Sequence, residues 1–133
     1  MDLDPVRRLH RYAPEKWSVQ QLLGHMIDTE RIFSCRALCI ARGDQTPLPG
    51  FEENDYVDAA GAENVEWSQL LDEFQAVGRS NLLLLRHLPA AGWTRIGMVN
   101  GAPTSVRVIA YIMAGHVAHH VAILRERYLQ MDE

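Results

Sequence analysis

Two histidines near the end of the sequence, His116 and His120, stand four residues apart. On a helix, residues at this spacing lie on one face, with about 5–6 Å between their Cβ atoms. Two imidazoles placed in this way can reach one metal ion, about 2.0–2.1 Å from each nitrogen. Imidazole suits this task because it is a borderline-soft nitrogen donor that is largely uncharged at neutral pH. The alternative for such a pair is two ordinary surface or core histidines.

A third histidine, His25, lies inside an apolar stretch that runs from Leu22 to Ile27. A lone histidine there is usually a core residue with its hydrogen bonds satisfied. Helical bundles, however, collect metal ligands from facing helices into their interior. We therefore predict that His25, His116 and His120 bind one divalent metal ion. Three protein ligands leave a coordination position open for water or substrate, which is typical of a catalytic site.

Two further polar residues adjoin these histidines. His119 is about 100° around a helix from His120 and could pair with His116 at a spacing of three. We rank it below His120 and expect a surface position or a supporting role. Asp28 follows His25 by three residues and could orient a ligand or a water, or act as a general base. Asp28 is thus the predicted catalytic residue, with a plain helix-surface aspartate as the alternative.

The bulk composition is that of an ordinary soluble domain. The chain has 133 residues, which predicts one domain over 1–133, and a formal net charge of -4 with a single lysine. Nucleic-acid binding is disfavoured because duplex-binding domains usually carry a clustered basic face. No run of about 20 apolar residues predicts a membrane span, and the N-terminus lacks a signal-peptide core, so we expect a cytoplasmic protein. Cys35 and Cys39 are expected to be small core residues, with a regulatory thiol pair as the alternative.

Helical periodicity predicts three long helices, over about 18–42, 65–88 and 104–129. Ser18, with Gln21 three residues later, forms a capping box at the start of the first of these helices. Residues 43–64 are expected to be a long loop, and 89–103 a connection with a tight turn at Asn100-Gly101. With almost no strand signal, the fold class is an all-α bundle.

Several motifs together resemble a known family. They are Trp17-Ser18, the run GHMIDTER over 24–31, RAL over 36–38, ARGD over 41–44, PLPGF over 47–51, and Gly115-His116 with His119-His120 near the end. In their order and combination they resemble the DinB-like (YfiT-like) metalloenzymes, over nearly the whole chain from about Tyr12 to Tyr128.

This resemblance implies a four-helix bundle whose metal is bound by one histidine of the second helix and two of the last, here His25, His116 and His120. The family is similar to thiol-dependent enzymes, including S-transferases and a maleylpyruvate isomerase. The expected protein is a divalent-metal-dependent enzyme of the thiol-dependent S-transferase or hydrolase type that acts on a small molecule. Its cofactors would be zinc or nickel and a low-molecular-weight thiol. The alternatives are a non-catalytic metal-binding or stress-related bundle protein, and a bundle whose histidines have lost the metal.

The sequence departs from the family at its start. Only sixteen residues precede Trp17, and Pro5 and Pro14 interrupt them. At most a short helix from about Pro5 to Tyr12 fits, so the first helix of the four is expected to be shortened or missing. A truncated or misassigned start is another explanation. An exposed apolar groove would then need cover, which predicts a homodimer, with or without a swapped element.

Overall fold

Helices dominate the computed structural model, which describes residues 3–128. The helices are α1 (Pro5–Arg8), α2 (Val19–Ala41), α3 (Glu53–Ala60), α4 (Trp67–Arg86) and α5 (Val106–Ile123), and α5 continues into a π-helical turn, Leu124–Tyr128. Short 3-10 turns span Ala62–Asn64 and Ala90–Thr94, and two strands, β1 (Ile96–Val99) and β2 (Ala102–Ser105), precede α5. The three predicted long helices are therefore present, and α2 and α4 begin and end within two residues of their predicted limits. The third begins at Val106, two residues after its predicted start, and its predicted end at 129 lies outside the described residues.

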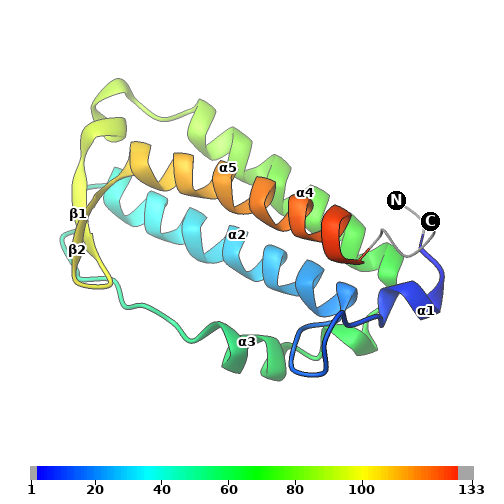
Figure 1. Cartoon of the computed structure of the whole chain (residues 1–133). Coiled ribbons are helices and arrows are strands. Elements are labelled where there is room, and N and C mark those ends of the chain that lie inside the picture. The colour runs from blue at the N-terminus through cyan, green and yellow to red at the C-terminus, as the bar shows by residue number, and fades with distance from the viewer. Residues whose placement is uncertain (1–2, 129–133) are drawn as a thin grey trace.

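The long helix α2 is the centre of the molecule and packs against both α4 and α5 (Figure 1). It begins where the sequence predicts, because Ser18 accepts a hydrogen bond from the backbone N–H of Gln21 and the Gln21 side chain accepts one from the backbone of Ser18. This helix buries two clusters of apolar residues. The cluster near its N-terminal end is Leu3, Val19, Leu22, Leu23, Ile27, Ala62, Trp67, Leu70, Val77 and Tyr128. The cluster near its C-terminal end is Ala37, Ile40, Ala41, Val106, Ile109 and Met113.

The segment 43–64 was expected to be a loop, and this prediction is wrong in part because it contains α3. The helix ends at Gly61, which has φ 64°. Glycine reaches this left-handed conformation without strain and commonly ends a helix. Val57 is buried, and Arg36 of α2 donates a hydrogen bond to the carbonyl of Pro49 (2.9 Å), which ties the segment to the bundle.

An antiparallel hairpin over residues 96–105 takes up the end of the predicted connection and the first two residues of the predicted third helix, and the sequence did not predict it. Its tight turn lies at Asn100-Gly101 as predicted, with φ values of 50° and 78°, and Val99 pairs with Ala102 across it. Positive φ at both central residues is the geometry that the right-handed strand twist favours in a two-residue hairpin. Leu48 adds a parallel bridge to Val99, so the hairpin also holds the start of the 43–64 segment.

Helix α1 has four residues, which agrees with the expectation of a shortened first helix.

Cys35 is exposed and Cys39 is half-buried, so their prediction as core residues is wrong. The segment Val106–Tyr128 is long and apolar enough to cross a membrane, as judged by length and composition alone.

Candidate metal centre

The three predicted histidines meet between α2 and α5. His25 comes from the first half of α2, and His116 and His120 come from adjacent turns of α5. The side chains of His25 and His120 are buried, with exposed fractions of 2% and 8%, and His116 is half-buried. The arrangement follows from the helical spacing on α5 and from the packing of α5 on α2.

One ring nitrogen of each histidine points into a common space. Nε2 of His116 is 3.3 Å from Nε2 of His25 and 3.0 Å from Nε2 of His120, and one nitrogen from each ring lies within 4.8 Å of the others. Tetrahedral ligands about 2.0–2.1 Å from an ion are separated by about 3.3 Å. The three nitrogens are thus already close to the spacing that one ion requires.

Thr29, one turn after His25 on α2, orients the His116 ring. Its hydroxyl donates to the carbonyl of His25 (2.9 Å), which leaves its lone pairs free to accept. Nδ1 of His116 lies 3.4 Å from the same oxygen, so this contact favours the tautomer with the proton on Nδ1. The lone pair of Nε2 then faces the other two histidines. In metal sites, a hydrogen bond to the other ring nitrogen commonly fixes the tautomer of a ligand histidine in this way.

Burial keeps the three imidazoles uncharged. Loss of hydration on burial, and secondarily the proximity of the other histidines, lower the pKa of His25 to about 3 and that of His120 to about 4. The pKa of His116 is lowered as well, first by burial and then by His119. Because a metal binds the neutral ring, all three side chains are in the ligand form at neutral pH.

The unpaired nitrogen of His120 is the one that points away from the other ligands. Nδ1 of His120 is buried and has no hydrogen-bond partner among residues 3–128, whereas its Nε2 faces His116. The convergence of one nitrogen from each of three neutral imidazoles is what fits one divalent ion, and the cluster is consistent with a metal site.

Aromatic rings enclose the histidines on two sides. The Trp17 ring lies 4.6 Å from that of His25, and the Phe33 ring 5.6 Å from that of His116. Trp17 is held in turn by Asn54 of α3, whose Oδ1 accepts a hydrogen bond from the indole Nε1 (3.1 Å). Helix α3, which the sequence analysis missed, therefore contributes to the wall of the site.

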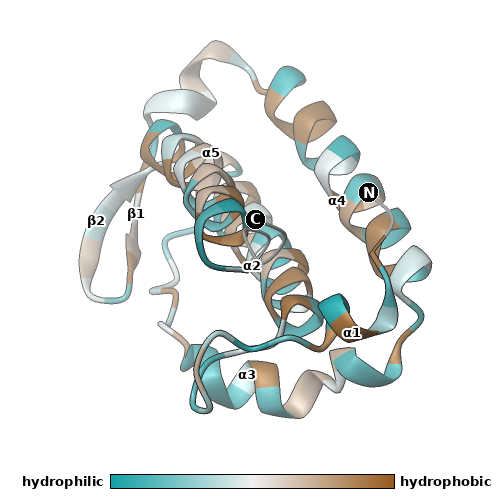
Figure 2. Cartoon of the chain, turned by 45° about the vertical axis from the view of Figure 1, so that its right-hand side comes forward, coloured by the Kyte–Doolittle hydropathy of each residue, from teal (hydrophilic) through white to brown (hydrophobic). Residues whose placement is uncertain are grey.

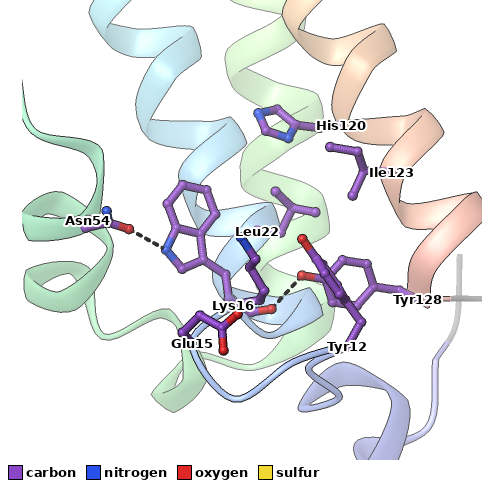
Figure 3. Close-up of a pocket in the computed structure, with 9 residues that line it drawn as sticks. Tyr12, Glu15, Lys16, Leu22, Asn54, His120, Ile123 and Tyr128 are labelled. Carbon is purple, nitrogen blue, oxygen red and sulfur yellow. Dashed lines mark hydrogen bonds between the residues drawn. The ribbon is translucent and has the colours of Figure 1, made fainter.

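A cavity of about 290 Å³ reaches His120 from the side of Trp17 (Figure 3). Its lining includes the aromatic rings of Tyr12 and Tyr128 and the charged side chains of Glu15 and Lys16. The hydroxyl of Tyr128 donates to the carbonyl of Trp17 (2.6 Å), so the end of the α5 segment closes this side of the cavity. The site thus combines an apolar aromatic wall with two opposite charges.

The other two candidate residues lie elsewhere. His119 is exposed, and its ring is 5.3 Å from that of His120. Asp28 lines a separate cavity of about 430 Å³ together with Tyr56 and Glu73, and burial raises the pKa of its carboxyl group. Thr29 and Phe33 are the α2 side chains described above that contact the ring of His116. The catalytic role of Asp28 stays a prediction.

Sequence reasoning missed Thr29, Asn54 and Tyr128 as parts of the site. For Thr29 a signal existed, because a residue four after His25 lies more closely above it on the helix than one three after it. For the other two no signal existed, because their approach to the histidines depends on how distant segments fold back.

Comparison with known proteins defines the class to which this fold and site belong. The DinB superfamily profile matches residues 2–124, so the chain belongs to the DinB superfamily. Among curated proteins, none matches the sequence significantly.

A solved structure, YfiT from Bacillus subtilis, superposes with a TM-score of 0.73 at 17% sequence identity, over 92% of this chain and 74% of that one. YfiT is described as "a probable metal-dependent hydrolase with an unusual four-helix bundle topology". At this identity the likeness establishes the shared four-helix-bundle fold.

Proposed function

We propose that this protein is a metal-dependent hydrolase of small molecules, with zinc or nickel bound by His25, His116 and His120. The observation that carries the proposal is the convergence of three neutral imidazole nitrogens beside a cavity. Such a three-histidine set leaves a position for a reacting group, whereas a purely structural site is usually closed by a fourth protein ligand. The likeness to YfiT, itself described as "a probable metal-dependent hydrolase", supports the same proposal.

The ion, when bound, supplies Lewis acidity and lowers the pKa of water, which makes hydrolysis possible at neutral pH. The protein's own residues orient the ligand histidines and enclose them. Thr29 sets the tautomer of His116, and Trp17 and Phe33 exclude bulk water from the buried faces of the rings. A low local dielectric strengthens electrostatic interactions in such a site.

The cavity beside His120 is where the substrate would bind. Tyr12 and Tyr128 offer an apolar surface, and their rings meet edge to face with centroids 5.1 Å apart. Glu15 and Lys16 line the same cavity and would bind polar or charged groups of the substrate. A volume near 290 Å³ suits a small metabolite rather than a polymer. Transfer of a group to a low-molecular-weight thiol instead of water is the second reaction that this cavity would allow.

The test is metal content followed by activity. Untagged protein is refilled with zinc or with nickel, its metal is measured by elemental mass spectrometry, and chromogenic esters, amides and thioesters are offered with and without a thiol. We expect about one equivalent of metal and a hydrolysis rate that a chelator abolishes and metal restores. A protein that takes up neither metal would refute the proposal. A protein that binds metal and reacts only when thiol is present would identify a transferase instead.

A further inference from the structure

The cavity beside His120 has a wall that the metal chemistry does not use, and the loop between α1 and α2 builds it. This loop runs beside α3 before α2 begins (Figure 2), and Tyr12, Glu15 and Lys16 of the loop line the cavity. Lys16 is the single lysine of the chain. Because the same cavity reaches a candidate metal ligand, these loop residues are placed to bind the part of a substrate that does not react.

The backbone of Lys16 is fixed from both sides. Its N–H donates a hydrogen bond to the carbonyl of Ala13 (3.1 Å), and its carbonyl accepts one from the guanidinium of Arg11 (2.9 Å). From this backbone the side chain points into the cavity, toward the side on which Leu22 and His120 lie (Figure 3). A group held in place before binding loses less conformational entropy when a ligand arrives.

The ammonium group of Lys16 has no ion-pair partner among the residues that the structure describes. Glu63, the acid that this loop contacts, is paired with Arg11 instead (2.7 Å). Glu15 shares the cavity, but it forms no ion pair with the Lys16 amine. The amine is therefore available to an anion that enters the cavity, where an apolar wall makes the attraction stronger than in bulk water.

A second hydrogen-bond donor faces the same space. The Tyr12 hydroxyl accepts a hydrogen bond from the guanidinium of Arg127 (3.1 Å), and it points toward the same part of the cavity as the Lys16 amine (Figure 3). The hydroxyl keeps its own proton to donate, and the bond that it accepts from a cation strengthens the one that it gives. Two donors that converge in this way match the two oxygens of a carboxylate.

The rest of the cavity suits an apolar body. Its lining includes the rings of Tyr12, Trp17 and Tyr128 and the aliphatic side chains of Leu22 and Ile123. A volume of about 290 Å³ corresponds to about ten water molecules at ~30 Å³ each. The ligand therefore has on the order of ten non-hydrogen atoms.

We propose that the substrate of this site is a small monocarboxylate with an aromatic or branched apolar body, and that Lys16 and Tyr12 bind its carboxylate. The inference rests on the proposed function for the reaction at the histidines, whereas binding of the carboxylate by the loop needs no metal. One ammonium and one hydroxyl offer a single positive charge, which suits a carboxylate better than a phosphate ester, since phosphate sites commonly gather several cationic or backbone N–H donors. Lys16 thus determines specificity and takes no part in the chemical step.

Three probes of matched size separate the charge from the apolar body: phenylpropionate, its neutral amide, and phenylpropylamine. Each is titrated into the full chain, metal-free and with zinc, and its dissociation constant is measured by ligand-observed NMR. We expect the metal-free protein to bind phenylpropionate about tenfold more tightly than the amide or the amine, because only the carboxylate gains charge-assisted hydrogen bonds. Lys16→Met should remove this preference, and phenyl phosphate should bind no more tightly than phenylpropionate.

The matched control is Arg107→Met, which removes the same charge from an exposed residue in the first turn of α5, about 20 Å along the helix from His120. This variant should keep the preference for the carboxylate. Glu15→Gln removes the acid of the cavity and should not weaken binding of phenylpropionate. Circular dichroism checks that each variant keeps its helices.

Chemical labelling of the wild type tests the same point without a substitution. Because Lys16 is the single lysine, acetylation by an amine-specific reagent is measured at one site by mass spectrometry of the peptide that contains it. Saturating phenylpropionate should slow this acetylation several-fold, and the amide should not.

Equal affinity for the three probes would overturn the proposal, as would tighter binding of the amine or of phenyl phosphate. Binding of phenylpropionate that requires zinc and survives Lys16→Met would mean that the carboxylate is a metal ligand, and would also overturn it. A protein that takes up no metal but shows the expected preference refutes the hydrolase and supports the carboxylate site, so the two proposals fail separately.

Discussion

At the scale of single residues, adjacent histidines on α5 have opposite environments. His120 is buried with its Nε2 facing His116, whereas His119 is exposed. We expect His120→Ala to lower metal affinity by more than the ~10–100-fold that follows loss of a supporting residue. His119→Ala is the matched control and should keep one equivalent of metal. Titration calorimetry with zinc measures both, and equal losses in the two variants would contradict the assignment of ligands.

Thr29 offers a finer test of the same site. Valine has nearly the shape of threonine but cannot accept a hydrogen bond from Nδ1 of His116, so the ring loses its preferred tautomer. We expect Thr29→Val to weaken zinc binding by about 10–100-fold. Thr29→Ser keeps the hydroxyl and should bind zinc nearly as the wild type does. If the valine variant binds zinc as tightly as the wild type, the hydroxyl has no part in orienting His116.

The sequence predicted the histidine cluster better than its surroundings. The spacing of His116 and His120 fixes their common face on any helix, and His25 needs only that α2 pack against α5. By contrast, Asp28 was assigned from its position three residues after His25, and the structure places it in a cavity with Glu73. A helical wheel gives direction around one helix, but which neighbour occupies each direction depends on tertiary packing.

At the scale of elements, two helical glycines next to ligands differ in what surrounds them. A Cβ added to Gly24 would lie 2.7 Å from Cβ of Ala62, whereas one added to Gly115 would meet nothing within 4 Å. Gly24 therefore lets the turn Ala62–Asn64 approach α2 closely. Alanine at an open helical position is better than glycine by about 1 kcal/mol.

We accordingly expect opposite signs for the two alanine substitutions. Gly115→Ala should raise the free energy of unfolding by about 1 kcal/mol through helix propensity. Gly24→Ala should lower it by roughly 1–2 kcal/mol, because overpacking outweighs the same gain. Urea denaturation of the metal-free protein measures both. A stabilised Gly24→Ala variant would mean that Ala62 moves aside without penalty.

The long helices were predictable and the short elements were not, for a physical reason. The helices α2, α4 and α5 are long enough for apolar periodicity to rise above chance, and Ser18 with Gln21 marks a start. Helix α3 has eight residues and one buried side chain, Val57, so it carries almost no periodic signal. The hairpin has four-residue strands, one with Pro103, and depends on its packing against α2. Its turn alone was local enough to predict.

At the scale of the whole molecule, α2 separates two faces of different character. One face carries the histidines, Trp17 and the cavity, and the other carries an apolar groove between α4 and α5.

The histidine cluster also couples the whole fold to pH. The pKa values of His25, about 3, and of His120, about 4, lie below the ordinary value near 6.5, and that of His116 is lowered too. The unfolded chain therefore binds more protons than the folded chain below pH about 6.5. The free energy of unfolding of the metal-free protein should be highest above that pH and should fall as the pH decreases toward 4.

Urea denaturation of metal-free protein at pH 7.5, 6.5 and 5.5 measures this dependence. We expect the midpoint concentration to drop between pH 6.5 and 5.5, and to drop less in His25→Gln, which removes the imidazole whose pKa is lowered to about 3. With zinc bound the fall should be steeper, because protons compete with the ion for the same nitrogens. A midpoint that stays constant from pH 7.5 to 5.5 without metal would mean that the folded protein accepts these protons freely. The cluster would then be open to water, and the conclusion that burial keeps its three imidazoles uncharged would be wrong.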